Sequence, residues 1–325
     1  MLVKNYLNQK KLIQEATRVG FGRGLVMAAK RDKQVVGLCC DLTDSTKMMD
    51  FKKEFPQRFF EIGVAEQNMA GVAAGLALSG KVPFMASYAV FSPGRNWDQI
   101  RVSICYNRAN VKIVGAHAGI SVGPDGATHQ ALEDIALIRS LPHMTVVAPA
   151  DSLEAAKATL AAAKLKGPVY LRLARSATPV FTTSRSSFRI GQAEVLLEGK
   201  DLLLIGAGPI LYQALLAAAQ LREQDIRATV INCHTIKPLD QKTILKWARK
   251  TKAVVTVEEH QVNGGLGGAV AELLAKKLPL PQEFVAMPDS FGESGQPEEL
   301  LKKYKMTADD VVKAGLKVLK RKSKI

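Results

Sequence analysis

The sequence predicts an α/β protein of two domains, each with a mostly parallel sheet that carries helices on both faces. Two observations support this prediction. Short apolar runs rich in β-branched residues alternate with longer segments of helical periodicity along most of the 325 residues, a pattern typical of parallel sheets covered by helices. The alternation lapses once, from Arg175 to Arg189, where Ser, Thr and Pro replace the periodic residues and favour a linker.

The first domain is expected over residues 1–182, with 183–189 as the linker. Its expected strands are Gln34–Cys39, Val82–Ala86, Val111–Gly115, Thr145–Ala148 and Val169–Leu173. Its expected helices are Leu12–Lys30, Glu66–Ser79, Asn96–Tyr106, Gln130–Ser140 and Ser152–Leu165. Ligands of such sheets bind at the carboxyl ends of the strands, so unusual residues at those ends are the candidates for a site.

A second, smaller domain is expected over residues 190–325. Its expected strands are Asp201–Ile205, Arg227–Asn232 and Ala253–Glu258, and its expected helices are Ile210–Leu221, Gln241–Lys250 and Gly268–Lys277. Two glycine clusters, GAGP at 206–209 and GGLGG at 264–268, each follow a strand. Neither has the full dinucleotide fingerprint, so tight strand-to-helix turns explain them better.

Composition limits the class of protein. The net charge is +15, but the basic residues are spread over many segments without an aromatic-interleaved block, so no nucleic-acid partner is expected. No apolar run has the length of a membrane span and the N-terminus has no apolar block, so neither membrane association nor a signal peptide is expected. The cysteines form no CxxC pair, which favours reduced thiols in a cytoplasmic protein. The histidines lack metal-ligand spacing, so no metal ligand is expected from this chain.

The run FEIGVAEQNMAGVAAGLALSG, residues 60–80, places Glu66 at the start of a helix of small residues. A carboxylate so close to apolar packing is costly unless a partner holds it. The aminopyrimidine ring of thiamine diphosphate fits, because a glutamate that shares a proton with its N1′ nitrogen activates the ring's exocyclic amine as a base. The alternative is an acidic residue stabilised only by the helix dipole.

The loop HAGISVGPDGATHQ, residues 117–130, brings His117, Asp125 and His129 together among three glycines. Glycines allow a close approach of the backbone to a ligand. Histidine suits proton transfer to and from hydroxyl groups near neutral pH. The alternative is a loop whose histidines only cap the following helix.

Three further strand ends carry candidate residues. Asp41 and Ser45 follow the first strand in CCDLTDST, although such residues also form turns and helix caps. Tyr88 and Phe91 lie where a strand gives way to a helix and could stack on a ring, although such aromatics are more often core. Arg175 ends the last strand region and could bind a phosphate.

Together, and in this order, these runs resemble the thiamine-diphosphate enzymes of the transketolase family. The resemblance implies that Glu66 activates the cofactor, that Phe91 stacks on its aminopyrimidine beside Tyr88, and that Asp41 lies next to it. GPDGATHQ resembles the family's substrate loop, which implies that Asp125 and His129 contact the hydroxyls of the donor sugar.

The resemblance assigns further residues to the substrate. His117 matches a histidine of the same pocket and is expected to take part in catalysis with Glu66 and His129. Ser45, Arg18 upstream of it and Arg175 are expected to bind the substrate phosphate.

The resemblance covers the family's pyrimidine-binding and C-terminal domains, and the GDG-then-Asn motif of the family's first domain is missing. It therefore implies the C-terminal subunit of a split transketolase, which moves a two-carbon ketol unit from a ketose phosphate to an aldose phosphate in the pentose phosphate pathway. A separate N-terminal subunit would hold Mg²⁺ or Ca²⁺ and the diphosphate, in a heterotetramer built as a dimer of heterodimers.

Three alternatives remain. One is 1-deoxy-xylulose-5-phosphate synthase, which shares a DG-then-HQ loop but usually occurs as one long chain. Another is the β subunit of a 2-oxoacid dehydrogenase, which is a separate chain but lacks the sugar-hydroxyl loop. The third is a non-catalytic interaction protein of the same fold, which has no need for both Glu66 and His129.

Overall fold

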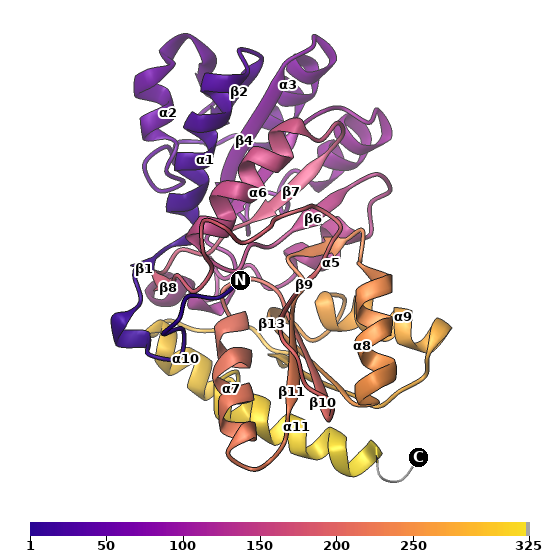
Figure 1. Ribbon diagram of the computed structural model, residues 1–325. Coiled ribbons are helices and arrows are strands. Elements are labelled where there is room, and N and C mark those ends of the chain that lie inside the picture. Colours follow the sequence, from indigo (N-terminus) through magenta and orange to yellow (C-terminus); the bar gives the residue numbers. More distant parts are fainter. Residues whose placement is uncertain (323–325) are drawn as a thin grey trace.

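The computed structural model describes residues 1–322 and contains a large sheet in each half of the chain (Figure 1). The first sheet is seven-stranded, in the order β12 (Thr235–Lys237), β6 (Thr145–Val147), β7 (Val169–Arg172), β5 (Lys112–Ala116), β4 (Val82–Tyr88), β2 (Val35–Cys39) and β3 (Phe59–Glu61). Its strands pair in parallel except for β12, which is antiparallel to β6. The prediction of a mostly parallel sheet is confirmed.

Helices cover both faces of the first sheet. On one face α1 (Thr17–Arg31) packs against α6 (Ser152–Lys164), and Gly20 allows this contact, because a Cβ there would lie 1.9 Å from the backbone oxygen of Ser152. On the other face lie α3 (Glu66–Leu78), the π-helical segment η3 (Ile100–Tyr106) and α5 (Asp134–Arg139). Shorter elements complete this half: α2 (Met49–Glu54), η2 (Pro56–Arg58), α4 (Trp97–Gln99) and η4 (Ile120–Asp125).

The second sheet is five-stranded, in the order β14 (Gln282–Met287), β13 (Val254–Gln261), β10 (Leu202–Gly206), β11 (Ala228–Asn232) and β9 (Glu194–Leu197). Only β9 is antiparallel to its neighbour. Alternate residues of β10 serve different cores: Leu202 and Leu204 pack with α7 (Leu211–Arg222) and α11 (Ala308–Lys322), whereas Leu203 and Ile205 pack with α8 (Gln241–Thr251) and α9 (Leu266–Lys277). The short α10 (Pro297–Lys303) packs on η4.

The two halves are joined by more than the linker. Strand β12 comes from the second half of the sequence but extends the first sheet. At the N-terminus, β1 (Gln14–Glu15) pairs with β8 (Thr178–Pro179), and Tyr212 of α7 donates a hydrogen bond to the backbone oxygen of Tyr6. The helix expected from Leu12 therefore begins only at Thr17, because residues 14–15 are extended in a strand pair. Likewise, the helix expected over Gln130–Ser140 is confined to α5.

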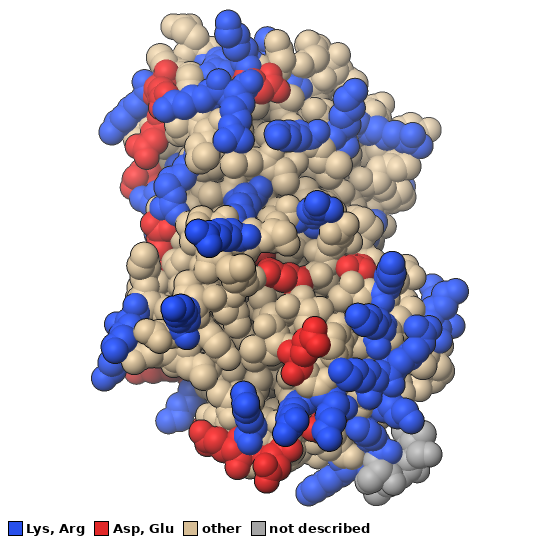
Figure 2. All heavy atoms as spheres, in the orientation of Figure 1, with Lys and Arg blue, Asp and Glu red and all other residues tan. Residues whose placement is uncertain are grey.

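The surface is rich in cations. Figure 2 shows Lys and Arg on both domains, with a gathering at the lower right, where Figure 1 places α8, α9 and α11. The last turns of these helices carry Arg249 and Lys250, Lys276 and Lys277, and Lys320, Arg321 and Lys322. Within residues 1–322, no helix combines the length and the apolar composition needed to cross a bilayer.

Candidate active site

The candidate residues of the first domain gather at the carboxyl edge of its sheet. Tyr88 is the last residue of β4, His117 follows β5, Asp41 lies just beyond β2, and Arg175 lies just beyond β7. Because β2, β4, β5 and β7 are parallel neighbours, their carboxyl ends meet at one edge, which is where ligands bind in sheets of this kind.

Glu66 is the first residue of α3 and its side chain is only 3% exposed. Ser87 donates a hydrogen bond to Oε1 at 3.2 Å, and Arg95 donates one to Oε2 at 3.0 Å. Asn96 donates to the backbone oxygen of Glu66 at 3.1 Å. The sequence indicated that this buried carboxylate needs a partner. In this chain, Arg95 is that partner.

Arg95 also covers an aromatic ring. Its guanidinium carbon lies 4.0 Å from the centroid of Phe91, one turn earlier in the chain. Phe91 in turn stacks beside Tyr88, with ring centroids 5.9 Å apart and planes 18° apart. Arg95, Glu66 and the two aromatic rings therefore form one continuous group.

The histidines of the loop join the same group. His117 stacks on Tyr88, with 3.8 Å between ring centroids. The ring of His129 lies edge to face with those of Phe91 and Tyr88, with centroid distances of 5.5 Å and 6.1 Å. The loop that the sequence singled out thus lies against the residues expected to hold the cofactor ring.

His117 is buried and lies at φ 55°, in the left-handed region that side chains rarely adopt. Burial, followed by the positive charges of Arg18 and Arg175, lowers the pKa of His117 to about 3. Its imidazole is therefore neutral at pH 7. Its Nδ1 atom has no hydrogen-bond partner among residues 1–322, and a buried polar atom without a partner is a site where a ligand can bind.

Two arginines form a cationic pair beside His117. Arg18 donates from Nε to the backbone oxygen of Arg175 at 3.1 Å and from a terminal nitrogen to that of Ser45 at 2.7 Å. Burial, followed by the nearby charge of Arg175, lowers the pKa of Arg18. Asp125 offsets the pair only partly, because its Oδ1 lies 3.8 Å from the Arg175 guanidinium. Like charges held this close favour an anionic ligand.

Asp41 lies at the same edge but apart from this group. Its backbone is left-handed, with φ 57°, and its backbone N–H donates to Oε1 of Glu61 at 2.7 Å. The side chain is exposed. Within the described part of the chain, Asp41 makes no hydrogen bond to the other predicted site residues.

The loop of residues 117–130 is fixed from the second domain. Glu259 on β13 accepts a hydrogen bond from the backbone N–H of Ser121 at 2.5 Å, and its backbone oxygen accepts one from Arg172 at 2.8 Å. Arg172 in turn forms a buried ion pair with Asp134, to which the Tyr170 hydroxyl also donates. This network crosses the domain interface immediately behind the loop.

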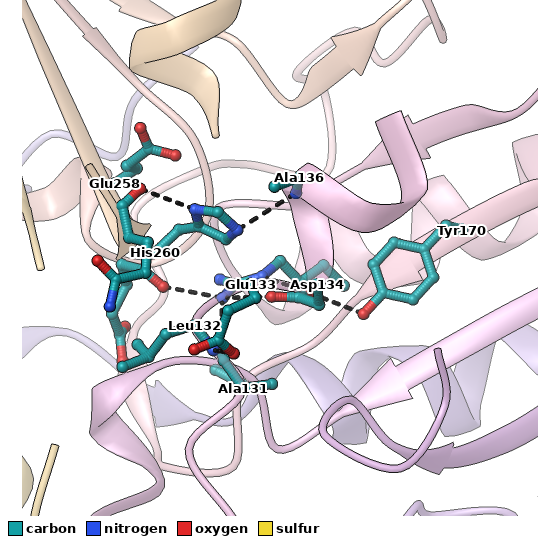
Figure 3. A network of polar contacts seen from close by, with 12 residues as sticks. Ala131, Leu132, Glu133, Asp134, Ala136, Tyr170, Glu258 and His260 are labelled. Carbon is teal, nitrogen blue, oxygen red and sulfur yellow. Dashed lines mark hydrogen bonds and ion pairs between the residues drawn. The ribbon is translucent and has the colours of Figure 1, made fainter. Parts of the chain in front are cut away.

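Figure 3 shows how the two domains meet in this network. Tyr170 points from the first sheet toward Asp134, and the ring of His260 lies between Glu258 and Ala136. The Nε2 atom of His260 accepts the backbone N–H of Ala136, at the start of α5, at 3.3 Å. Glu258 caps a helix instead: its carboxylate accepts hydrogen bonds from the backbone N–H groups of Leu266 and Gly267 at the start of α9.

Comparison with protein families gives two matches. The family described as "Transketolase, pyrimidine binding domain" matches residues 14–180, and "Transketolase, C-terminal domain" matches residues 191–311. The chain is also 42% identical over 312 residues to the "Putative transketolase C-terminal section" of Methanocaldococcus jannaschii, covering 95% of this chain and 98% of that protein.

The chain belongs to the transketolase family.

Relatives in the family differ in the fraction of their length that matches this chain. A solved structure described as "Split gene transketolase, inactive beta4 tetramer" is 47% identical, with a TM-score of 0.89, and covers 95% of this chain and 99% of its own. The human transketolase is 38% identical over 303 residues, but those residues are 48% of its length and 92% of this chain. The matched residues thus span nearly all of that solved chain, but only about half of the human transketolase.

Three residues of the site were not predicted from the sequence. Arg95 was missed because its ion pair with Glu66 depends on how the turn after β4 folds back over α3. Lys47 adds a positive charge near His117, and nothing in its sequence context indicates this. Glu259 lies far from the loop of residues 117–130 in sequence, so only the folded arrangement of the two domains brings it to that loop. Within residues 1–322, no cluster of metal-ligating side chains occurs.

Proposed function

We propose that this chain is the C-terminal subunit of a split transketolase, which moves a two-carbon ketol unit from a ketose phosphate to an aldose phosphate. The observation that carries the proposal is the meeting, at one sheet edge, of a buried carboxylate, an aromatic pair, a histidine-bearing loop and a pair of arginines. A non-catalytic protein of this fold has no need to keep all four.

The residues present fit thiamine diphosphate. Glu66 is a buried carboxylate beside an aromatic group, and the neighbouring His117 has a buried Nδ1 atom that lacks a partner among residues 1–322. Bound thiamine diphosphate would supply the carbon nucleophile and the electron sink for the transfer. Glu66 would share a proton with ring nitrogen N1′, while Phe91 and Tyr88 would offer flat apolar surface to the ring. Asp41 would lie at the margin of this pocket.

The loop residues would act on the hydroxyl groups of the sugar. His117, being neutral at pH 7 because its pKa is about 3, would donate or accept a hydrogen bond rather than act as a cationic acid. His129 and Asp125 lie on the same loop and would hold a hydroxyl and relay its proton. The Thr128 hydroxyl is 2.9 Å from Nδ1 of His129 and orients that ring.

Arg18, Arg175 and Ser45 would bind the far end of the sugar. Two relatives support an anionic substrate: a 6-deoxy-6-sulfo-D-fructose transketolase component of Clostridium sp., 40% identical, and an apulose-4-phosphate transketolase component of Phocaeicola vulgatus, 38% identical. Both names describe sugars that carry a tetrahedral anion. We propose a phosphorylated sugar for this chain, as in the pentose phosphate pathway.

A second chain would complete the site. A separate N-terminal subunit would hold Mg²⁺ or Ca²⁺ and the diphosphate, and two such pairs would assemble as a heterotetramer. The likeness to a split-gene transketolase supports this arrangement. The cytoplasm suits the chain, because its four cysteines are free and buried, as is usual in reducing compartments.

The test is co-expression of the chain with a candidate N-terminal subunit, followed by two assays on the purified complex. Ketol transfer between sugar phosphates is expected, with no condensation that depends on pyruvate. The reverse result would identify the synthase or dehydrogenase alternative instead. Absence of both activities, in a complex that binds thiamine diphosphate, would overturn the proposed reaction.

A further inference from the structure

We propose that Arg95 holds the place of the cofactor's aminopyrimidine ring in the chain without cofactor, and that binding of the ring displaces it. This inference rests on the proposed function, since it takes Glu66 and Phe91 as the residues that meet the ring. It adds a residue that sets cofactor affinity without itself being needed for the reaction.

The geometry of Arg95 resembles what those two residues would offer to a ring. A guanidinium is flat and cationic, with N–H donors in its plane. One of these donors lies 3.0 Å from Oε2 of Glu66, while the guanidinium carbon lies 4.0 Å from the centroid of Phe91. A ring that met the same carboxylate oxygen and the same face of Phe91 would overlap the guanidinium.

The burial of Glu66 explains why Arg95 occupies this position. The carboxylate is 3% exposed, and Ser87 gives it one neutral hydrogen bond. A buried carboxylate needs a cation or several donors to offset its lost hydration. Among the described residues, Arg95 supplies the ion pair of Glu66. The guanidinium therefore neutralises a charge that would otherwise be buried alone until the cofactor binds.

The exposure of Arg95 explains why it can leave. Its side chain is 48% exposed, and the contacts that hold it are one ion pair and one cation–aromatic contact. The guanidinium itself is half in water, so it regains its hydration when it leaves, and the cost of the exchange falls on Glu66, which the arriving ring would pair with instead. The side chain can therefore turn into solvent without opening a cavity, whereas Glu66 and Phe91 are held by α3 and the turn after β4.

The experiment measures the dissociation constant of thiamine diphosphate by calorimetry in the two-chain complex with Mg²⁺. In Arg95→Gln, the competing group is weakened while Glu66 still awaits a partner, so the cofactor should bind about tenfold more tightly, equivalent to about 1.4 kcal/mol. The matched control is Arg101→Gln, which makes the same change at an exposed arginine of η3 and should leave the constant unchanged. Equal or weaker binding by Arg95→Gln would overturn the proposal.

A second variant and a double-mutant cycle test the same proposal independently of Arg95→Gln alone. If Arg95→Gln does not fold, Arg95→Lys keeps the charge but loses the planar group, and it should bind the cofactor more tightly than the natural chain by a smaller factor; no gain would again overturn the proposal. In a Glu66→Gln background, Arg95→Gln should have little further effect, because the ion pair is already lost.

The same measurements separate this proposal from the proposed function. A natural complex that binds no thiamine diphosphate at all would contradict the proposed function. Normal binding that is indifferent to Arg95→Gln would contradict only the role of Arg95.

Discussion

Glu259 and Ser121 belong to different domains, yet the carboxylate of one accepts the backbone N–H of the other at 2.5 Å. The contact is closely fitted, because a Cβ at the neighbouring Gly119 would lie 2.4 Å from Oε1 of Glu259. The second domain therefore fixes the backbone of the loop that carries His117 and His129, although it contributes none of the predicted site residues.

Loss of this contact should lower kcat/KM for the sugar and leave the affinity for the cofactor unchanged. In Glu259→Ala, the N–H of Ser121 is left buried without a partner, at a cost of about 1–3 kcal/mol, and the loop loses its fixed position. We expect kcat/KM for the sugar to fall about tenfold or more, with the cofactor dissociation constant unchanged. Glu259→Gln, which keeps an acceptor oxygen, should recover most of the loss. Glu272→Ala is the matched control, since its carboxylate is 58% exposed; an equal loss there would point to a general effect of lost charge.

Replacement of Glu66 by Gln should separate folding from cofactor activation. The amide keeps the shape of the side chain and can still accept from Ser87, so the complex should assemble and take up cofactor. It cannot share a proton in the same way, so kcat should fall on the order of 10² or more. Exchange of the C2 proton of bound cofactor with deuterium isolates the activation step. Exchange at the natural rate would mean that the activating carboxylate lies elsewhere.

Arg175→Ala should discriminate between substrates. A charge-assisted phosphate contact of about 2–3 kcal/mol predicts a loss of about 30- to 160-fold in kcat/KM for phosphorylated sugars, and a much smaller loss for unphosphorylated ones. Because Arg175 also donates to the backbone oxygen of Val122 at 3.0 Å, an equal loss with both substrate classes would show that the residue acts by supporting the loop. Arg185→Ala, at an exposed position between the two matched family domains, is the control.

The isolated chain should have no transketolase activity and should bind thiamine diphosphate poorly. The predicted site residues of this chain include none that would hold the metal and the diphosphate, and no metal-ligating cluster occurs within residues 1–322. Activity should appear on titration with the N-terminal subunit and reach a plateau at an equal molar ratio. Turnover by the highly purified chain with cofactor and Mg²⁺ would contradict the two-chain proposal.

His117 should make the protein less stable at acid pH. Its pKa is about 3 in the folded chain, against an ordinary value of 6.5. The unfolded chain therefore binds more protons between these values, and stability falls as pH drops below about 6.5. His117→Asn removes this group, so the loss of stability between pH 7 and pH 5 should be smaller in the variant, by on the order of 1 kcal/mol. Chemical denaturation at the two pH values measures it, and identical pH dependence would contradict the assignment.

The buried strands were predictable from the sequence because both of their faces are covered. Helices on each side make β2, β4, β5 and β10 almost continuous apolar runs, and their observed bounds lie close to the expected ones. Strand β12 was missed, because its three residues are ordered by pairing with β6, far away in sequence. The predicted start of α1 was wrong for a similar reason, because Gln14 and Glu15 form strand β1 and pair with β8.

The candidate site was predictable where a residue stands out locally. Glu66 among small residues, and the histidines among glycines, are conspicuous in the sequence, and the structure brings Glu66, Tyr88, Phe91, His117 and His129 into one group. The partner of Glu66 was not conspicuous, since its identity depends on how the turn after β4 folds back over α3. A pattern of residue types reveals that a buried charge needs a partner, and only the fold reveals which partner it has.

Strand β12 makes the first sheet depend on residues from the second half of the chain. A break in the gene between the two family domains, which match residues 14–180 and 191–311, would leave β6 at the edge of the first sheet without its antiparallel neighbour. Exposed strand edges invite aggregation, and the fragment would also lose the carboxylate of Glu259 behind its loop. Gene fission between these two domains would therefore weaken the first-domain fragment, whose sheet edge and loop both depend on residues of the second domain.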